Sequence, residues 1–165
     1  MNVIFLDIDG VLNYQNYFIS NHDYFLYKVD KVKYKSSILR YVRRQLMDID
    51  YEKLHLLKDI IDVTESKVVV ISSWKSLIIY SYIERILNSL GIPIIGRTYD
   101  NIFNRGMGIK EYLLNNDVYN YIIIDDEIFD DYDEELLSRL VKTNFYDVGL
   151  SKEHKTKAIK LLKNN

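Results

Sequence analysis

Residues 3–13 read V-I-F-L-D-I-D-G-V-L-N, which is four apolar residues, two aspartates one residue apart, and a glycine. Parallel strands buried on both faces are continuous apolar runs, and α/β proteins keep their chemistry at the carboxyl ends of such strands. Because side chains alternate along a strand, Asp7 and Asp9 lie on one side of the chain and Ile8 on the other. Gly10 allows a tight turn directly afterwards. This stretch therefore predicts a buried strand that delivers two carboxylates to the edge of a parallel sheet.

Further apolar runs alternate with helical patterns along the chain. Strands are predicted over 67–72, 92–95, 121–125 and 140–143, and helices over 51–63, 76–90, 107–116 and from Ser151 onward. This alternation is typical of a parallel sheet with helices on both faces. The chain has 165 residues, of which 48% are apolar, and no repeat or linker interrupts it. We therefore expect one α/β domain over residues 1–165.

Composition excludes several kinds of site and partner. The chain has no cysteine, so disulfides, thiolate metal sites and cysteine nucleophiles are ruled out. A net charge of −2 gives no global attraction to nucleic acid or to an anionic membrane. No apolar run approaches the roughly 20 residues of a membrane span, and no basic leader precedes the first strand. We expect a cytoplasmic protein with no membrane partner.

Residues 14–49 do not fit the alternation of strands and helices. Because they directly follow the first strand, we expect them over the carboxyl edge of the sheet, as a short lid or a surface that contacts the substrate. Basic and aromatic side chains together suit contacts with phosphates and bases. The alternative is a solvated loop and helix. The basic residues are Lys28, Lys31, Lys33, Lys35, Arg40, Arg43 and Arg44, and the tyrosines are Tyr14, Tyr17, Tyr24, Tyr27, Tyr34 and Tyr41.

Polar side chains end three of the predicted strands. They are the pairs Asp7 and Asp9, Ser72 and Ser73, and Asp125 and Asp126. Four carboxylates around one crevice repel each other unless a cation lies among them, and a site with only oxygen ligands suits Mg²⁺. A divalent cation beside a carboxylate nucleophile favours phosphoryl transfer, because the cation neutralises the phosphate oxygens. The sequence therefore predicts a Mg²⁺ site and a phosphorylated substrate.

These motifs resemble the haloacid dehalogenase (HAD) superfamily of phosphatases over nearly the whole chain. The first motif, D-x-D-G, is residues 7–10; the second, a Ser or Thr at a strand end, is Ser72; the fourth, paired acids, is residues 125–126. A closer similarity is to the HAD domains of Swiss Army Knife RNA repair proteins, and a looser one to the phosphatase half of polynucleotide kinase-phosphatases. The supporting stretches are residues 3–13, 71–75, 105–113, 122–127 and 149–151. The resemblance implies a Rossmann-like three-layer fold with a central parallel sheet and a small or minimal cap.

The resemblance also implies catalytic roles. Asp7 would be the nucleophile that forms an aspartyl-phosphate, and Asp9 the acid that protonates the leaving alcohol and then activates water. Ser72 would donate a hydrogen bond to the transferring phosphoryl group, with Ser73 as the alternative. Gly10 is a further candidate for contact with the substrate.

Metal ligands and a catalytic cation follow from the same resemblance. Asp126, Asp7 and the main-chain carbonyl of Asp9 would hold Mg²⁺, while Asp125 would act directly or through a water. The cation of the third motif is predicted to be Arg105, which matches an R-G-x-x-I pattern. Its rivals are Lys110 and Arg97. The position of Lys110 inside a helix is more typical of an exposed lysine than of a catalytic one.

The expected function is Mg²⁺-dependent hydrolysis of a phosphomonoester on a nucleotide or a nucleic-acid end, in the manner of a 3′-phosphatase. A small cap favours a bulky substrate. No P-loop motif is present, so a kinase or ligase partner would be a separate chain. The alternatives are a small-molecule phosphatase, such as a nucleotidase or sugar-phosphatase, and a non-catalytic phosphate-binding module.

Overall fold

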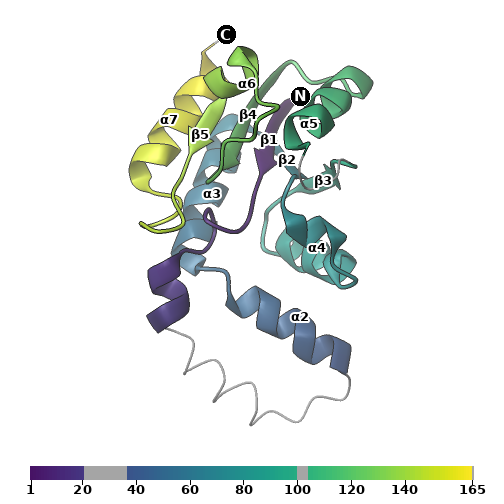
Figure 1. The fold of residues 1–165 in the computed structure, drawn as a ribbon, viewed down its shortest axis with the longest axis vertical. Helices are drawn as coiled ribbons and strands as arrows, with labels where there is room; N and C mark the ends of the chain where they lie inside the picture. The colour runs from purple at the N-terminus through teal and green to yellow at the C-terminus, as the bar shows by residue number, and fades with distance from the viewer. Residues whose placement is uncertain (21–36, 100–103, 165) are drawn as a thin grey trace.

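The computed structural model of the protein describes residues 1–20, 37–99 and 104–164 (Figure 1). Within these residues, five strands form one parallel sheet in the order β3-β2-β1-β4-β5. The strands are β1 (Asn2–Leu6), β2 (Lys67–Val70), β3 (Ile94–Arg97), β4 (Asn120–Asp125) and β5 (Leu140–Lys142). The predicted α/β fold is confirmed, with the strand of the opening stretch at the centre of the sheet.

Helices cover both faces of the sheet, which explains the continuous apolar runs in its strands. Along β1, Ile4 and Leu6 join a core with α3, α4 and α7, whereas Val3 and Phe5 join a second core with α5 and α6. In the described part of the chain, no helix is both long enough and apolar enough to cross a bilayer. The helices are α2 (Ser37–Met47), α3 (Tyr51–Thr64), α4 (Tyr80–Ser89), α5 (Arg105–Asn115), α6 (Glu134–Ser138) and α7 (Lys152–Lys163), with a 3₁₀ turn η1 (Ser73–Ser76).

Several element boundaries differ from the predicted ones for local reasons. The helix predicted to begin at residue 76 begins at 80, because η1 and a turn come first. The third strand begins at residue 94 instead of 92, since Pro93 has no N–H and only its carbonyl accepts a hydrogen bond, from Val68. The short helix α6 follows Asp133, whose carboxylate caps it by accepting from the Leu136 N–H.

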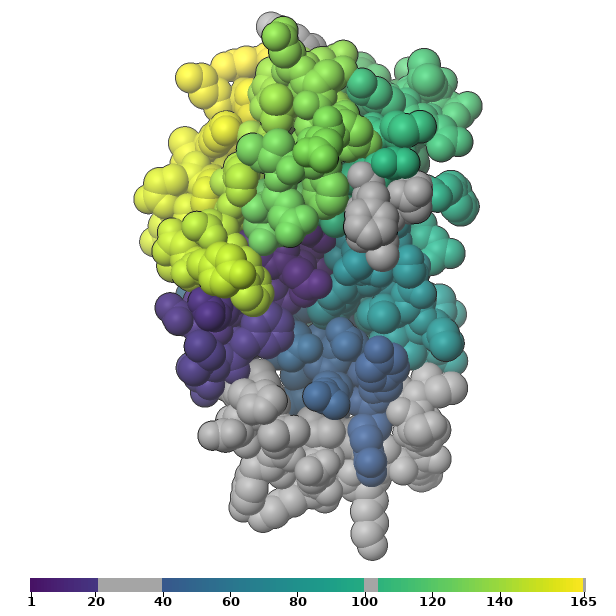
Figure 2. Space-filling view, in the orientation of Figure 1, coloured from purple at the N-terminus to yellow at the C-terminus, as the bar shows by residue number. Residues whose placement is uncertain are grey.

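The described parts of the segment inserted after β1, residues 14–20 and 37–49, lie beyond the carboxyl ends of the strands (Figure 1). Residues 15–20 are helical, and α2 contacts α4. Residues 21–36 lie outside the described residues. They include Lys28, Lys31, Lys33 and Lys35 of the predicted contact surface. The chain rejoins the domain at Asp50, whose N–H donates to the Leu12 carbonyl at 2.7 Å and whose carboxylate caps α3. Figure 2 shows the purple N-terminal segment reaching the surface between the green β4 to α6 region and the blue α2 region.

The strand order creates a switch point between β1 and β4. From β1 the chain proceeds outward to β2 and β3, then crosses back to β4 on the other side of β1. Ligands of open α/β sheets bind at the carboxyl ends of strands at such a point. The backbone just past β1 is fixed there, because the Asp7 N–H donates to the Ile124 carbonyl of β4 at 2.9 Å.

Candidate active site

Asp7 emerges from β1 into a turn that the backbone itself holds in place. Asp7 is 5% exposed, and one of its carboxylate oxygens accepts from the N–H of Ile8 at 2.8 Å. Gly10 takes a left-handed conformation with φ of +70°, and its N–H donates to the side chain of Asn13 at 2.9 Å. The turn therefore aims Asp7 into the switch point and carries the chain away from it.

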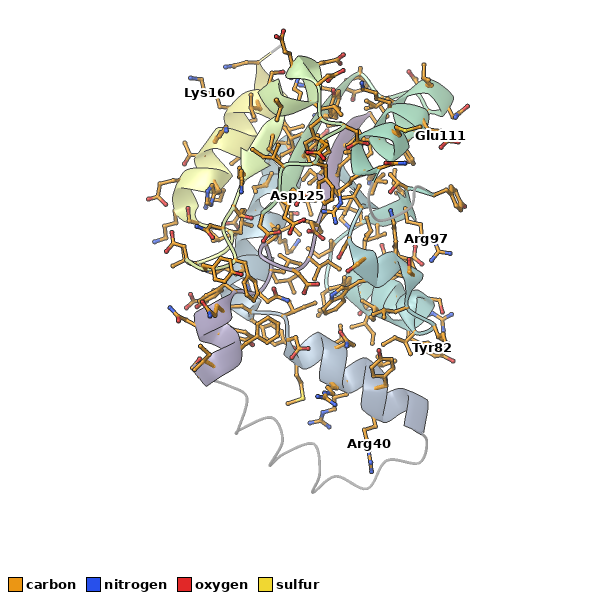
Figure 3. The ribbon with its side chains drawn as sticks, in the orientation of Figure 1. Arg40, Tyr82, Arg97, Glu111, Asp125 and Lys160 are labelled. Carbon is orange, nitrogen blue, oxygen red and sulfur yellow. The ribbon has the colours of Figure 1, made fainter. Side chains whose placement is uncertain are left out.

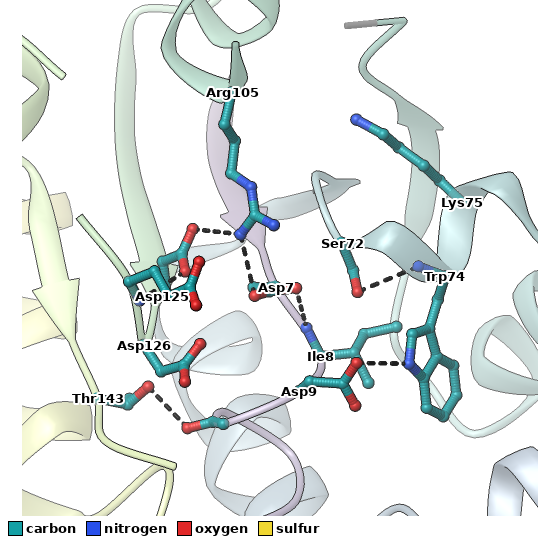
Figure 4. Close-up of polar contacts among 12 residues, drawn as sticks. Asp7, Ile8, Asp9, Ser72, Trp74, Lys75, Arg105, Asp125, Asp126 and Thr143 are labelled. Atoms are coloured by element: carbon teal, nitrogen blue, oxygen red, sulfur yellow. Dashed lines mark hydrogen bonds and ion pairs between the residues drawn. The ribbon is translucent and has the colours of Figure 1, made fainter. Parts of the chain in front are cut away.

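The second aspartate of the motif is held separately from the first. The Asp9 carboxylate accepts from the side-chain amide of Asn13 at 2.9 Å. It also accepts from the indole N–H of Trp74 at 2.9 Å (Figure 4). Burial raises the pKa of Asp9 above its ordinary value, and the neighbouring charge of Asp7 adds to the rise, while these two hydrogen bonds oppose it. A carboxyl group with a raised pKa is suited to transferring protons.

Three carboxylates converge at the switch point. Oxygen atoms of Asp7, Asp125 and Asp126 all lie within 4.8 Å of one another. Burial raises the pKa of Asp126 to about 6, with further contributions from Asp7 and Glu127. Burial and Asp7 also raise the pKa of Asp125. The cost of gathering these charges and their oxygen-only chemistry both fit a hard divalent cation such as Mg²⁺.

Arg105 bridges two of these acids from the first position of α5. Its guanidinium contacts Asp7 at 2.9 Å and Asp125 at 2.6 Å, and it stacks 4.2 Å above the ring of Phe129. Burial lowers the pKa of Arg105, but the two carboxylates raise it above its ordinary value, so the side chain stays charged. The Tyr132 hydroxyl also donates to Asp125, at 3.2 Å. These contacts fix Asp7 and Asp125 relative to each other.

The rival cations of the third motif lie elsewhere. Lys110 is an exposed lysine of α5 that pairs with Asp133 at 2.6 Å. Arg97 stacks 4.9 Å above the ring of Tyr80 and donates to the main-chain carbonyl of Lys75 at 2.5 Å. Of the three candidates, Arg105 is the one in contact with the acid group.

The two serines after β2 differ in exposure. Ser72 is fully buried and caps η1 by accepting from the Trp74 N–H at 3.4 Å, and Figure 4 shows it beside Asp7. Ser73 is exposed. The geometry therefore favours Ser72 over Ser73 as the hydroxyl beside the acids.

Sequence reasoning missed three residues that support the site. Asn13 and Trp74 hold Asp9, and the hydroxyl of Thr143 donates to the Gly10 carbonyl at 2.8 Å. Thr143 comes directly after β5, and its N–H donates to the Asp125 carbonyl at 2.9 Å. The signal in the sequence is that Thr143 is a polar residue at the end of the fifth predicted strand. Polar residues at strand ends also mark the acids and serines of the site.

Replacing Gly10 with Ala should destabilise the protein and weaken its binding of Mg²⁺. A left-handed conformation costs an L-residue roughly 1–2 kcal/mol, and a methyl group at this position would overlap the Asp126 carboxylate. The matched control is Gly96→Ala, whose new methyl would meet only the Tyr112 ring, at 3.8 Å. Thermal unfolding with and without Mg²⁺ measures both effects. Equal behaviour of the two variants would contradict this account of the turn.

Replacing Asp126 with Asn should stabilise the metal-free protein at neutral pH. The folded pKa of about 6 exceeds the ordinary value of 3.8, so between these values the folded state binds more protons than the unfolded state. Stability therefore falls as pH rises through this window. The variant should unfold at a higher temperature than wild type above pH 6 and at a similar temperature near pH 4.

Mg²⁺ should reverse that order. It should raise the unfolding temperature of the wild type at pH 7.5 but scarcely that of Asp126→Asn, and the wild-type gain should fade below pH 6 because ligands must be deprotonated. Thermal scans at several pH values with and without Mg²⁺ test both parts. An unchanged Mg²⁺ response in the variant would remove Asp126 from the metal site.

Comparison with known proteins gives one family match. A family model described as the HAD domain in Swiss Army Knife RNA repair proteins matches residues 3–155. Curated proteins and solved structures give no match. The matched range contains β1 from its second residue, the whole of β2 to β5 and every acid at the switch point.

Proposed function

The chain belongs to the HAD domain family of Swiss Army Knife RNA repair proteins, and from this membership we propose that it is a Mg²⁺-dependent phosphatase acting on nucleic-acid ends. The resemblance of its sequence to that family is thereby confirmed. The observation that carries the proposal is the group of Asp7, Asp125 and Asp126 at the switch point, joined by Arg105. Asp9, which Asn13 and Trp74 hold by hydrogen bonds, supplies the second carboxyl group that the reaction needs.

In the first step, a carboxylate oxygen of Asp7 attacks the phosphorus of the substrate. The bond between phosphorus and the leaving alcohol breaks, and protonated Asp9 gives its proton to that oxygen. The raised pKa of Asp9 supports this role, because it increases the protonated fraction near neutral pH. The products are an alcohol and an aspartyl-phosphate on Asp7.

In the second step, Asp9 acts as a base. It takes a proton from a water molecule whose oxygen attacks the phosphorus, and the bond between phosphorus and Asp7 breaks. Inorganic phosphate leaves, Asp7 is again a carboxylate, and Asp9 is again protonated. The hydrogen bonds from Asn13 and Trp74 keep Asp9 in one orientation through both steps.

The remaining residues of the site neutralise the charge of the phosphate and orient the reacting groups. Asp7, Asp126 and Asp125, with the carbonyl of Asp9, would hold Mg²⁺, which supplies positive charge to the phosphate oxygens. Arg105 fixes the attacking carboxylate of Asp7 through its 2.9 Å contact. Ser72 would donate its hydroxyl to a phosphoryl oxygen.

The segment after β1 supports a polymeric substrate. Arg40, Arg43 and Arg44 are exposed on α2, and the sequence of this helix contains no acidic residue. This helix lies beyond the carboxyl ends of the strands, on the side from which a substrate would enter (Figure 1). Arginines in this place suit a phosphate backbone, and the segment retains its proposed role as a short lid or contact surface.

A panel of phosphate esters tests the proposal. Phosphate release with Mg²⁺ would be measured from 3′- and 5′-phosphorylated RNA and DNA oligonucleotides, mononucleotides and sugar phosphates. We expect the highest kcat/KM on oligonucleotide ends, falling steeply with added salt. Release from small phosphates alone, independent of salt, would indicate a metabolite phosphatase. No release from any ester would indicate a phosphate-binding module.

A further inference from the structure

Two adjoining cavities flank β3, one bordered by α5 and the other by α4. Each has a volume of about 400 Å³, and they share Gly96, Arg97 and Tyr99 as lining residues. Neither cavity is lined by any residue of the acid group. The proposed chemistry leaves both of them unused.

Tyr99 and Arg97 present recognition groups to these cavities. Tyr99 is 89% exposed and belongs to neither hydrophobic core. Arg97 is exposed too, but its guanidinium is held by the Tyr80 ring at 4.9 Å and by the Lys75 carbonyl at 2.5 Å. One aromatic face and one anchored cation therefore stand together on the surface.

The sheet fixes how far this pair lies from the nucleophile. Hydrogen bonds run from the Ile71 N–H to the Leu6 carbonyl and from the Thr98 N–H to the Val70 carbonyl. Asp7 and Thr98 are therefore level with each other, two strand spacings apart, or roughly 10 Å. In Figure 3, Arg97 lies to the right of Asp125, on the side of the picture where α4 lies. A strand whose terminal phosphate is bound at Asp7 would therefore place its next nucleotide near Arg97 and Tyr99.

We propose that Tyr99 and Arg97 bind the nucleotide next to the phosphorylated end of a single strand, with its base stacked on Tyr99 and its phosphate near Arg97. This inference rests on the proposed function. Aromatic rings beside a basic residue are the usual means of holding single strands without a sequence preference. Glu84 and Glu111 also line the cavities, one in each, and a carboxylate accepts hydrogen bonds from base amino groups. Contacts with the next nucleotide would favour a strand over a small phosphate, which has no such unit.

Steady-state kinetics of Tyr99→Ala test the stacking contact. The variant should raise KM for a phosphorylated oligonucleotide by roughly 5- to 150-fold, as expected for loss of one stacked base, and leave release from p-nitrophenyl phosphate unchanged. The matched control is Tyr119→Ala. Tyr119 is also an exposed tyrosine, but it lies just before β4, at the amino ends of the strands. Unchanged KM for the oligonucleotide, or an equal loss on both substrates, would overturn the proposal.

Direct binding separates this inference from the proposed activity. Fluorescence anisotropy of a labelled oligonucleotide lacking a terminal phosphate would be measured with wild type, Tyr99→Ala and Arg97→Gln. Both variants should bind more weakly, and Arg97→Gln should also lower the slope of log K against log salt by about 0.7, the value for one contact with a single strand. If the protein releases no phosphate but shows these losses, the inference stands and the proposed function fails. Equal affinity of all three proteins would reject the inference.

Discussion

Replacing Asp7 with Asn should abolish phosphate release while leaving the protein folded. Loss of the covalent nucleophile of a serine protease lowers kcat by about six orders of magnitude. An amide has nearly the shape of a carboxylate but cannot attack phosphorus, and it carries no charge for Mg²⁺. Arg105 would keep its 2.6 Å contact with Asp125, so the site should retain its arrangement.

The measurement is phosphate release from the best substrate of the panel, together with thermal unfolding of the same sample. The control is Asp117→Asn, which makes the same chemical change at an exposed position before β4, at the amino ends of the strands. This variant should behave as wild type. A folded Asp7→Asn protein with more than about one hundredth of wild-type activity would exclude Asp7 as the nucleophile.

Replacing Arg105 with Met should damage both stability and activity. The change leaves Asp7 and Asp125 buried beside each other without their shared cation. Removing one partner of a buried ion pair costs about 3–5 kcal/mol, which corresponds to roughly 2–4 °C in unfolding temperature for each kcal/mol in a chain of this size. Mg²⁺ should restore part of this stability, because it neutralises the same carboxylates.

Urea unfolding with and without Mg²⁺ measures the stability, and phosphate release measures the activity. Arg105→Lys should retain more stability than Arg105→Met, although a lysine lacks the planar fork that reaches two carboxylates at once. Lys110→Met is the control, since Lys110 is exposed and pairs only with Asp133 among the acids of the described residues. If Lys110→Met lost activity and Arg105→Met kept it, the assignment of the third-motif cation would be reversed.

The sheet and its acids could be predicted because they depend on local pattern. Buried parallel strands read as apolar runs, and acids directly after such runs meet at one edge whatever the strand order. Asp7, Asp125 and Asp126 were found in this way. The bounds of η1 and α6 were harder to predict, because they depend on side chains that cap only one turn, such as Ser72 and Asp133.

The supporting contacts of the site could not be predicted, because they join residues far apart in the chain. Trp74 donates to a carboxylate 65 positions earlier, and Thr143 donates to a carbonyl 133 positions earlier. Their residue types are compatible with many other roles, so the sequence alone did not distinguish them. The position of Arg105 was predicted from a family pattern, whereas its bridge between Asp7 and Asp125 emerges only from the fold.

The central claim is that phosphoryl transfer passes through Asp7, and trapping the intermediate tests it most directly. The protein would be mixed with Mg²⁺ and its best substrate, quenched in acid during turnover, digested and examined by mass spectrometry. We expect a phosphoryl group on the peptide that contains Asp7. The same modification should form in Asp9→Asn when hydrolysis of the intermediate is the slower step in that variant. A phosphoryl group found reproducibly on another residue, with Asp7 unmodified during active turnover, would contradict it.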